Sequence, residues 1–98
     1  SSMPVQHIVW MTLKDSQAQE AMREVLEGIE SLRSLPGVLD INVGENFTDR
    51  AQGCTHGAVI TLESREALDA YISHPDHQRV GAQIRAICDL LALDYEYN

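Results

Sequence analysis

Basic residues, cysteines and long apolar runs are scarce in this chain of 98 residues. Seven Lys and Arg residues face fifteen Asp and Glu residues, which gives a net charge of −8. An acidic surface repels phosphate groups, and the basic residues form no cluster, so we expect no binding to nucleic acid. No apolar run approaches the ~18 residues that cross a bilayer, so we expect no membrane segment.

The two cysteines, Cys54 and Cys88, lie far apart and form no C-x-x-C motif. They predict two reduced thiols in a cytoplasmic protein rather than a disulfide framework. Ser1 and Ser2 resemble residues left by cloning, which makes Met3 the expected natural start. The remaining length, 3–98, fits one domain.

The hydrophobic pattern predicts the element order βαββαβ, because alternation marks strands and a repeat of three to four residues marks helices. Strands are expected at Val5–Leu13, Val38–Val43, Cys54–Leu62 and Leu91–Tyr97. The first helix is expected from Ser16 to about Ser34, with Asp15 or Ser16 as its cap. A second helix is expected to begin after Ser64 and to break at Pro75.

This order predicts an α+β, ferredoxin-like fold in which a four-stranded antiparallel sheet carries helices on one face. In the second strand, Leu39 is expected to share one face with Ile41 and Val43. The other face is expected to be bare and half apolar, with Ile8, Trp10, Val59, Thr12, Thr55, Thr61, Asp94 and Glu96. Such a face favours pairing with a second sheet.

Four histidines stand out as candidate functional residues: His7, His56, His74 and His77. We expect the first and third strands to be central, parallel neighbours, which would place His7 and His56 side by side under the helices. The helix after Ser64 runs back along the sheet and would bring Tyr71, His74 and His77 to the same end. Together, these five side chains are expected to line one pocket.

Each of these residues also has a structural interpretation. A histidine on a strand is often held by hydrogen bonds, a tyrosine in an apolar stripe often packs in the core, and His74-Pro75 suits a helix-end turn. Burying several imidazoles is costly unless each finds a partner, which favours a small-molecule pocket. No metal is expected, because no H-x-x-x-H pair is present. The glycines form no phosphate or dinucleotide loop, so no organic cofactor is expected.

Several strings resemble the stress-responsive dimeric α/β-barrel (Dabb) domain family: HIVWMTLKD, THGAVITLES, ALDAYISHPDHQRV and LALDYE. The resemblance extends from about Val5 to Tyr97, and Y-x-x-H-P-x-H is its most specific part. It implies a ferredoxin-like fold and a homodimer whose two sheets close into a barrel with the helices outside.

The family includes a plant polyketide cyclase that performs an aldol condensation without metal or organic cofactor. Similarity to it implies that His77 is a general base, that Tyr71 donates to the oxyanion, and that His7, His56 and His74 contact the substrate. Gly28 stands near a position where that cyclase has a pocket tyrosine, so a different substrate is implied.

Two functions therefore stay open. The first is a stress-associated protein that binds a small apolar or phenolic ligand. The second is a cofactor-independent cyclase, lyase or isomerase that acts on an enolisable or phenolic substrate. Metal-dependent activity and cofactor-free oxygenase chemistry are further alternatives.

Overall fold

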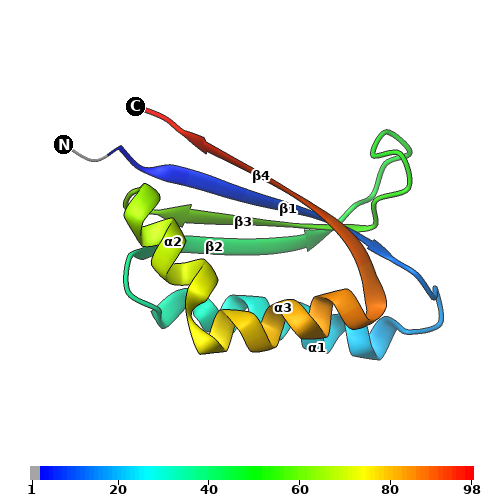
Figure 1. Cartoon of the computed structure of the whole chain (residues 1–98). Coiled ribbons are helices and arrows are strands. Elements are labelled where there is room, and N and C mark those ends of the chain that lie inside the picture. Colours follow the sequence, from blue (N-terminus) through cyan, green and yellow to red (C-terminus); the bar gives the residue numbers. More distant parts are fainter. Residues whose placement is uncertain (1–2) are drawn as a thin grey trace.

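The computed structural model describes residues 3–98, so the expectation about Ser1 and Ser2 lies outside the described part. The strands are β1 (Val5–Leu13), β2 (Val38–Glu45), β3 (His56–Leu62) and β4 (Cys88–Glu96). The helices are α1 (Gln19–Ser31), the 3-10 turn η1 (Leu32–Ser34), α2 (Arg65–Ser73) and α3 (Pro75–Ile87). The strands form one antiparallel sheet in the order β2-β3-β1-β4, with the helices on one face (Figure 1). The predicted fold class is confirmed.

The direction of β3 differs from our expectation. Strands β1 and β3 are central neighbours, but they run antiparallel, with Met11 opposite His56 and His7 opposite Ile60. The cause lies in the connections. The helical crossover from β1 returns the chain parallel to β1 in β2, and the turn into β3 then reverses it. The expectation that His7 and His56 lie side by side is therefore wrong.

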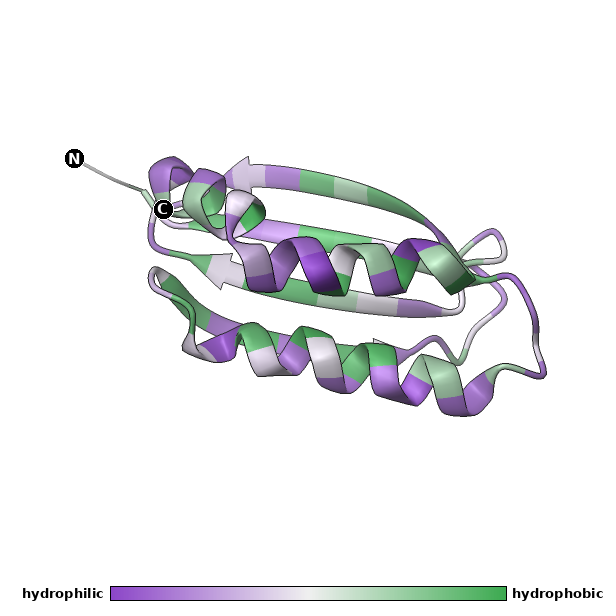
Figure 2. Cartoon of the chain, turned by 60° about the horizontal axis from the view of Figure 1, so that its bottom comes forward, coloured by the Kyte–Doolittle hydropathy of each residue, from purple (hydrophilic) through white to green (hydrophobic). Residues whose placement is uncertain are grey.

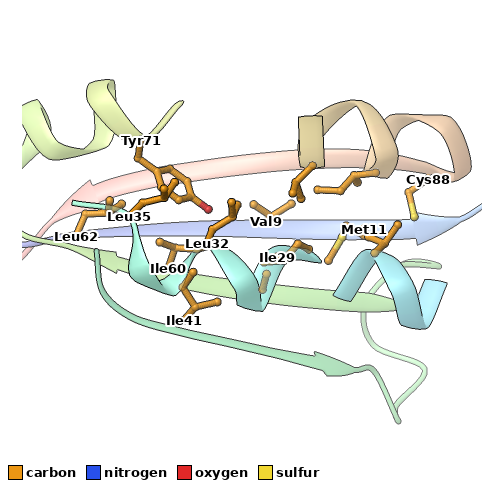
Figure 3. Packing of buried hydrophobic residues seen from close by; sticks show 14 of the residues in the cluster. Val9, Met11, Ile29, Leu32, Leu35, Ile41, Ile60, Leu62, Tyr71 and Cys88 are labelled. Carbon is orange, nitrogen blue, oxygen red and sulfur yellow. The ribbon is translucent and has the colours of Figure 1, made fainter. Parts of the chain in front are cut away.

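The core lies between the sheet and the helices, and alternate residues of the strands supply one side of it (Figure 3). Helix α1 supplies residues spaced three or four apart, such as Met22, Val25 and Ile29. Figure 2 shows hydrophilic and hydrophobic residues alternating along this helix, as expected for one face on the core and one in water. Each fully buried Leu, Ile or Met side chain stabilises the fold by about 1.5–3 kcal/mol.

An irregularity in β2 changes the expected faces of this strand. Val38 pairs with Leu62 and Asp40 pairs with Thr61, so the register shifts between them. The extra residue, Leu39, is left exposed, whereas Ile41 is buried. The prediction that Leu39 shares a face with Ile41 is wrong, because strict alternation does not continue through a bulge.

The residues of β4 that face the helices and those on the bare face are the reverse of the prediction. Its pairing with β1 begins at Cys88 opposite Leu13, and this register puts Asp94 opposite His7 on the helix-covered face. Asp94 and Glu96 are therefore not on the bare face. Their places are taken by three large apolar residues of β4, Leu91, Leu93 and Tyr95, which are all exposed.

The helix ends follow the sequence only in part. Ser64 caps α2 as predicted, because its hydroxyl accepts a hydrogen bond from the Ala67 amide at 3.1 Å. Helix α1 begins later than predicted, and the residue before it, Ala18, provides no side-chain cap. Asp15 instead accepts from the Gln17 amide and builds a turn ahead of the helix. Within residues 3–98, no helix has the length and apolar character needed to cross a bilayer.

Candidate functional site

Three aromatic rings from three elements meet between the helices and the sheet. The ring of Tyr71, from the last turn of α2, lies 4.7 Å from that of His77 in the first turn of α3, measured between centroids. The ring of His7, from β1, lies 6.0 Å from that of Tyr71 in an edge-to-face arrangement. Figure 3 shows Tyr71 reaching from α2 toward Val9 and Leu32. Of the five predicted site residues, these three come together.

The junction of α2 and α3 explains why Tyr71 and His77 meet. Pro75 occupies the first position of α3, where a missing amide hydrogen costs nothing, and it ends α2. His74 is the cap of α3, because its Nδ1 accepts a hydrogen bond from the Asp76 amide at 3.1 Å. His74 thus shapes the site by ending one helix and starting the next.

His7 is held by a residue that the sequence analysis missed. Its Nδ1 is hydrogen-bonded to the carboxylate of Asp94, which lies directly opposite on β4. The carboxylate accepts a hydrogen bond from Nδ1–H, so Nε2 is the ring nitrogen left for another partner. The signal that could have found Asp94 was the register of β4, which the alternation of apolar residues alone assigned to the wrong face.

His77 is oriented by the main chain at the end of α2. Its Nδ1 lies 3.0 Å from the Ile72 carbonyl oxygen and donates to it, which leaves Nε2 as an acceptor in the neutral ring. Burial lowers the pKa of His77, the charges of His7 and Arg85 act in the same direction, and the Ile72 carbonyl opposes them. Neutral imidazole is therefore favoured near pH 7.

Tyr71 is almost sealed, with 2% of its surface exposed. Burial raises the pKa of its phenol to about 12, so the hydroxyl keeps its hydrogen at neutral pH. The hydroxyl makes no hydrogen bond to any residue of 3–98, and neither does Nε2 of His7 or of His77. No fully enclosed side-chain nitrogen or oxygen in this range lacks a partner, so each of these three atoms is at least slightly accessible to solvent.

His56 lies away from this cluster. It stands four positions from Ile60 along β3, and Ile60 is the residue opposite His7, which separates the two histidines by about 13 Å along the sheet. Its neighbours are Thr55 and Glu45 rather than Tyr71. The expectation of one pocket lined by all five side chains is therefore wrong.

Two hollows of the surface lie at the His56 end. One of about 470 Å³ and another of about 830 Å³ both include Glu45 and His56 in their walls, and neither is lined by the three clustered rings. Within residues 3–98, no three His, Cys, Asp or Glu side chains gather closely enough to hold a metal ion.

Comparison over nearly the whole chain assigns the protein to a family. A family model described as the stress-responsive A/B barrel domain matches residues 5–97. The chain belongs to this family. The Dabb assignment agrees with the observed sheet order and with helices confined to one face.

Relatives of this Dabb chain carry different names. It is 31% identical to the stress-response A/B barrel domain-containing protein HS1 of Arabidopsis thaliana, over 95% of this chain and 89% of HS1. It is 30% identical to olivetolic acid cyclase of Cannabis sativa, over 95% of this chain and 96% of the cyclase. A crystal structure from Jannaschia, described as a dimeric ferredoxin-like protein of unknown function, is 28% identical, with a TM-score of 0.84 and coverage of 96% and 99%.

Proposed function

We propose that this Dabb protein binds a small apolar or phenolic ligand that presents an oxygen atom to His7, Tyr71 and His77. The observation that carries the proposal is the set of three polar atoms that have no hydrogen-bond partner among residues 3–98, on neighbouring rings. Ligand sites typically combine an apolar wall with a few convergent polar groups. Val9 and Leu32 supply apolar surface beside Tyr71 (Figure 3).

A second candidate is acid–base catalysis at the same site. Nε2 of neutral His77 is free to take a proton from a carbon next to a carbonyl group, and the electron pair left behind forms an enolate. The hydroxyl of Tyr71 then donates a hydrogen bond to the enolate oxygen. The cyclase name of the cannabis relative supports this candidate, and the stress-response name of the Arabidopsis relative supports the first.

We also infer that the protein works as a homodimer in the cytoplasm. The exposed apolar residues of the bare sheet face support pairing with a second copy, as does the dimeric description of the Jannaschia structure. Cys54 and Cys88 are free thiols, which supports a reducing compartment.

One experiment tests the proposed function, using thermal unfolding in the presence of resorcinol and of 4-phenyl-2-butanone. We expect both compounds to raise the melting temperature of the wild type. The variants Tyr71→Phe and His77→Ala should bind about tenfold more weakly, because each loses a hydrogen bond in a desolvated place. Tyr95→Phe is the matched control, since Tyr95 lies on the opposite sheet face.

The ketone also separates the two candidates. Hydrogen–deuterium exchange at its carbon next to the carbonyl reports proton removal, and His77→Ala should abolish any exchange that the wild type catalyses. Binding without exchange would leave the ligand-binding function and reject the catalytic one. If neither compound binds, or if Tyr71→Phe binds like the wild type, the proposed site is wrong.

A further inference from the structure

The end of the sheet away from Tyr71 carries a second arrangement of polar groups, centred on His56. This side chain is buried, with 6% of the residue exposed, at the start of β3. It borders the hollow of about 470 Å³ between the sheet, the start of α1 and the loop that joins β2 to β3. The walls of this hollow are Leu13, Ser16, Gln19, Glu45, Asn46, Thr48, Asp49, Gly53, Cys54, Thr55 and His56.

The hydrogen bonds of Thr55 favour one tautomer of His56. The Thr55 hydroxyl has one hydrogen, which it donates to the Met11 carbonyl at 3.2 Å. The same oxygen accepts from the Leu13 amide at 2.9 Å. With the hydroxyl hydrogen directed at Met11, Nδ1 of His56, at 2.8 Å from this oxygen, is the donor and the hydroxyl oxygen is the acceptor. The neutral ring then carries its lone pair on Nε2.

That lone pair meets no donor among residues 3–98. The closest charged atom is Oε2 of Glu45, at 3.8 Å, which is too far for a hydrogen bond and is itself an acceptor. Burial lowers the pKa of His56, while the charge of Glu45 opposes this shift. Two acceptors thus face each other, and a group that carries at least two N–H or O–H hydrogens is needed between them.

The charge of the walls selects the kind of donor. Glu45 and Asp49 bring two carboxylates, and no Lys or Arg belongs to the lining of this hollow. A cation is therefore favoured over an anion or a neutral alcohol. A metal ion requires several ligands at short range, and the described residues gather no such set. An ammonium group needs only acceptors.

We infer that this hollow binds the primary ammonium group of a small organic molecule, which donates one hydrogen to Nε2 of His56 and another to the Glu45 carboxylate. The apolar side chain of Leu13 and the thiol of Cys54 provide contact for a short carbon chain. The site is separate from the proposed ligand site at Tyr71, and neither depends on the other.

The test is an NMR titration of the full chain with n-butylammonium chloride at constant ionic strength, observing the ring signals of His56. We expect saturable shifts. Tetramethylammonium, which has the same charge but no N–H, should leave these signals in place, and so should butanol. Glu45→Gln should weaken binding about tenfold, and Glu63→Gln, an exposed carboxylate at the far end of β3, should change it less than about twofold.

Three outcomes would overturn the inference. The first is that n-butylammonium leaves the His56 signals unshifted, in which case water alone bridges His56 and Glu45. The second is an equal response to tetramethylammonium, which would reveal general charge attraction. The third is unchanged affinity in Glu45→Gln. Glu45 is exposed at the end of β2, so its substitution should leave the fold intact, and the amide spectrum verifies this.

Discussion

Burial is the largest cause of the pKa shift at each titratable ring for which a shift is resolved. It lowers the pKa of His56 and His77 and raises that of Tyr71, so all three are held in their neutral forms. The hydrogen bonds then decide which atom of each neutral histidine faces a ligand. For both His56 and His77, Nδ1 is used inside the protein and Nε2 is left free.

The lowered pKa values predict a dependence of stability on pH. In the unfolded chain these two histidines titrate near 6.5, and in the folded chain they titrate below that value. The unfolded state thus binds more protons in between, so the free energy of unfolding is highest above about pH 6.5 and falls as the solution is acidified. The double variant His56→Gln/His77→Gln should lose less melting temperature than the wild type between about pH 7.5 and 5.5. An equal loss would show that other groups cause the acid sensitivity.

Local spacing was enough to predict part of the site. Tyr71 and His77 meet because they flank one helix junction, and Pro75 marks that junction in the sequence. The rest depends on contacts between distant strands. The position of His56 required the direction of β3, and the role of Asp94 required the register of β4. Periodicity reports which residues share a face but not which face that is.

At the scale of elements, the second helical region is two helices with separate caps. Ser64 starts α2 and His74 starts α3, each by accepting a main-chain hydrogen bond in the first turn. The junction between the two helices brings the rings of Tyr71 and His77 to 4.7 Å between centroids. The elements themselves were predictable because their caps and breakers are local signals, whereas the bulge at Leu39 had no local mark.

The role of Ser64 as the cap of α2 can be tested directly. Ser64→Ala should lower the free energy of unfolding by about 1 kcal/mol, because the Ala67 amide loses its acceptor. Ser16→Ala is the control, since α1 begins after Ala18 without a side-chain cap and this serine should contribute little. Chemical denaturation of both variants measures the difference. Equal effects would contradict the assignment of Ser64 as the cap.

At the scale of the whole molecule, the sheet leaves one face without helices. Trp10 on β1 and Leu91, Leu93 and Tyr95 on β4 lie on this face, and each is about half exposed or more. The observed orientation of β4 makes this surface more apolar than the sequence suggested. Two acidic residues predicted to lie on it face the helices instead, and three large apolar residues take their places. The reason for expecting a dimer is stronger as a result.

A charge on this face should break the dimer. Leu93→Lys would bury an unpaired ammonium between two sheets, so we expect the variant to be a folded monomer. Ile72→Lys places the same charge on the outer side of α2 and should leave the dimer intact. Light scattering coupled to gel filtration measures the mass. A monomeric wild type, or a dimeric Leu93→Lys variant, would refute pairing through this face.

The first and last strands of the chain are neighbours, and this has a mechanical consequence. Strands β1 and β4 are antiparallel, and the Tyr97 amide still donates to the Pro4 carbonyl at 3.1 Å, so both chain ends leave from the same end of the sheet (Figure 1). Force applied between these ends loads the interstrand hydrogen bonds one pair at a time, beginning with the Tyr97–Pro4 bond and continuing beside Val5 and Glu96. A domain pulled in this geometry unzips at low force. Force applied at the two ends would therefore detach the edge strand β4 from β1 first.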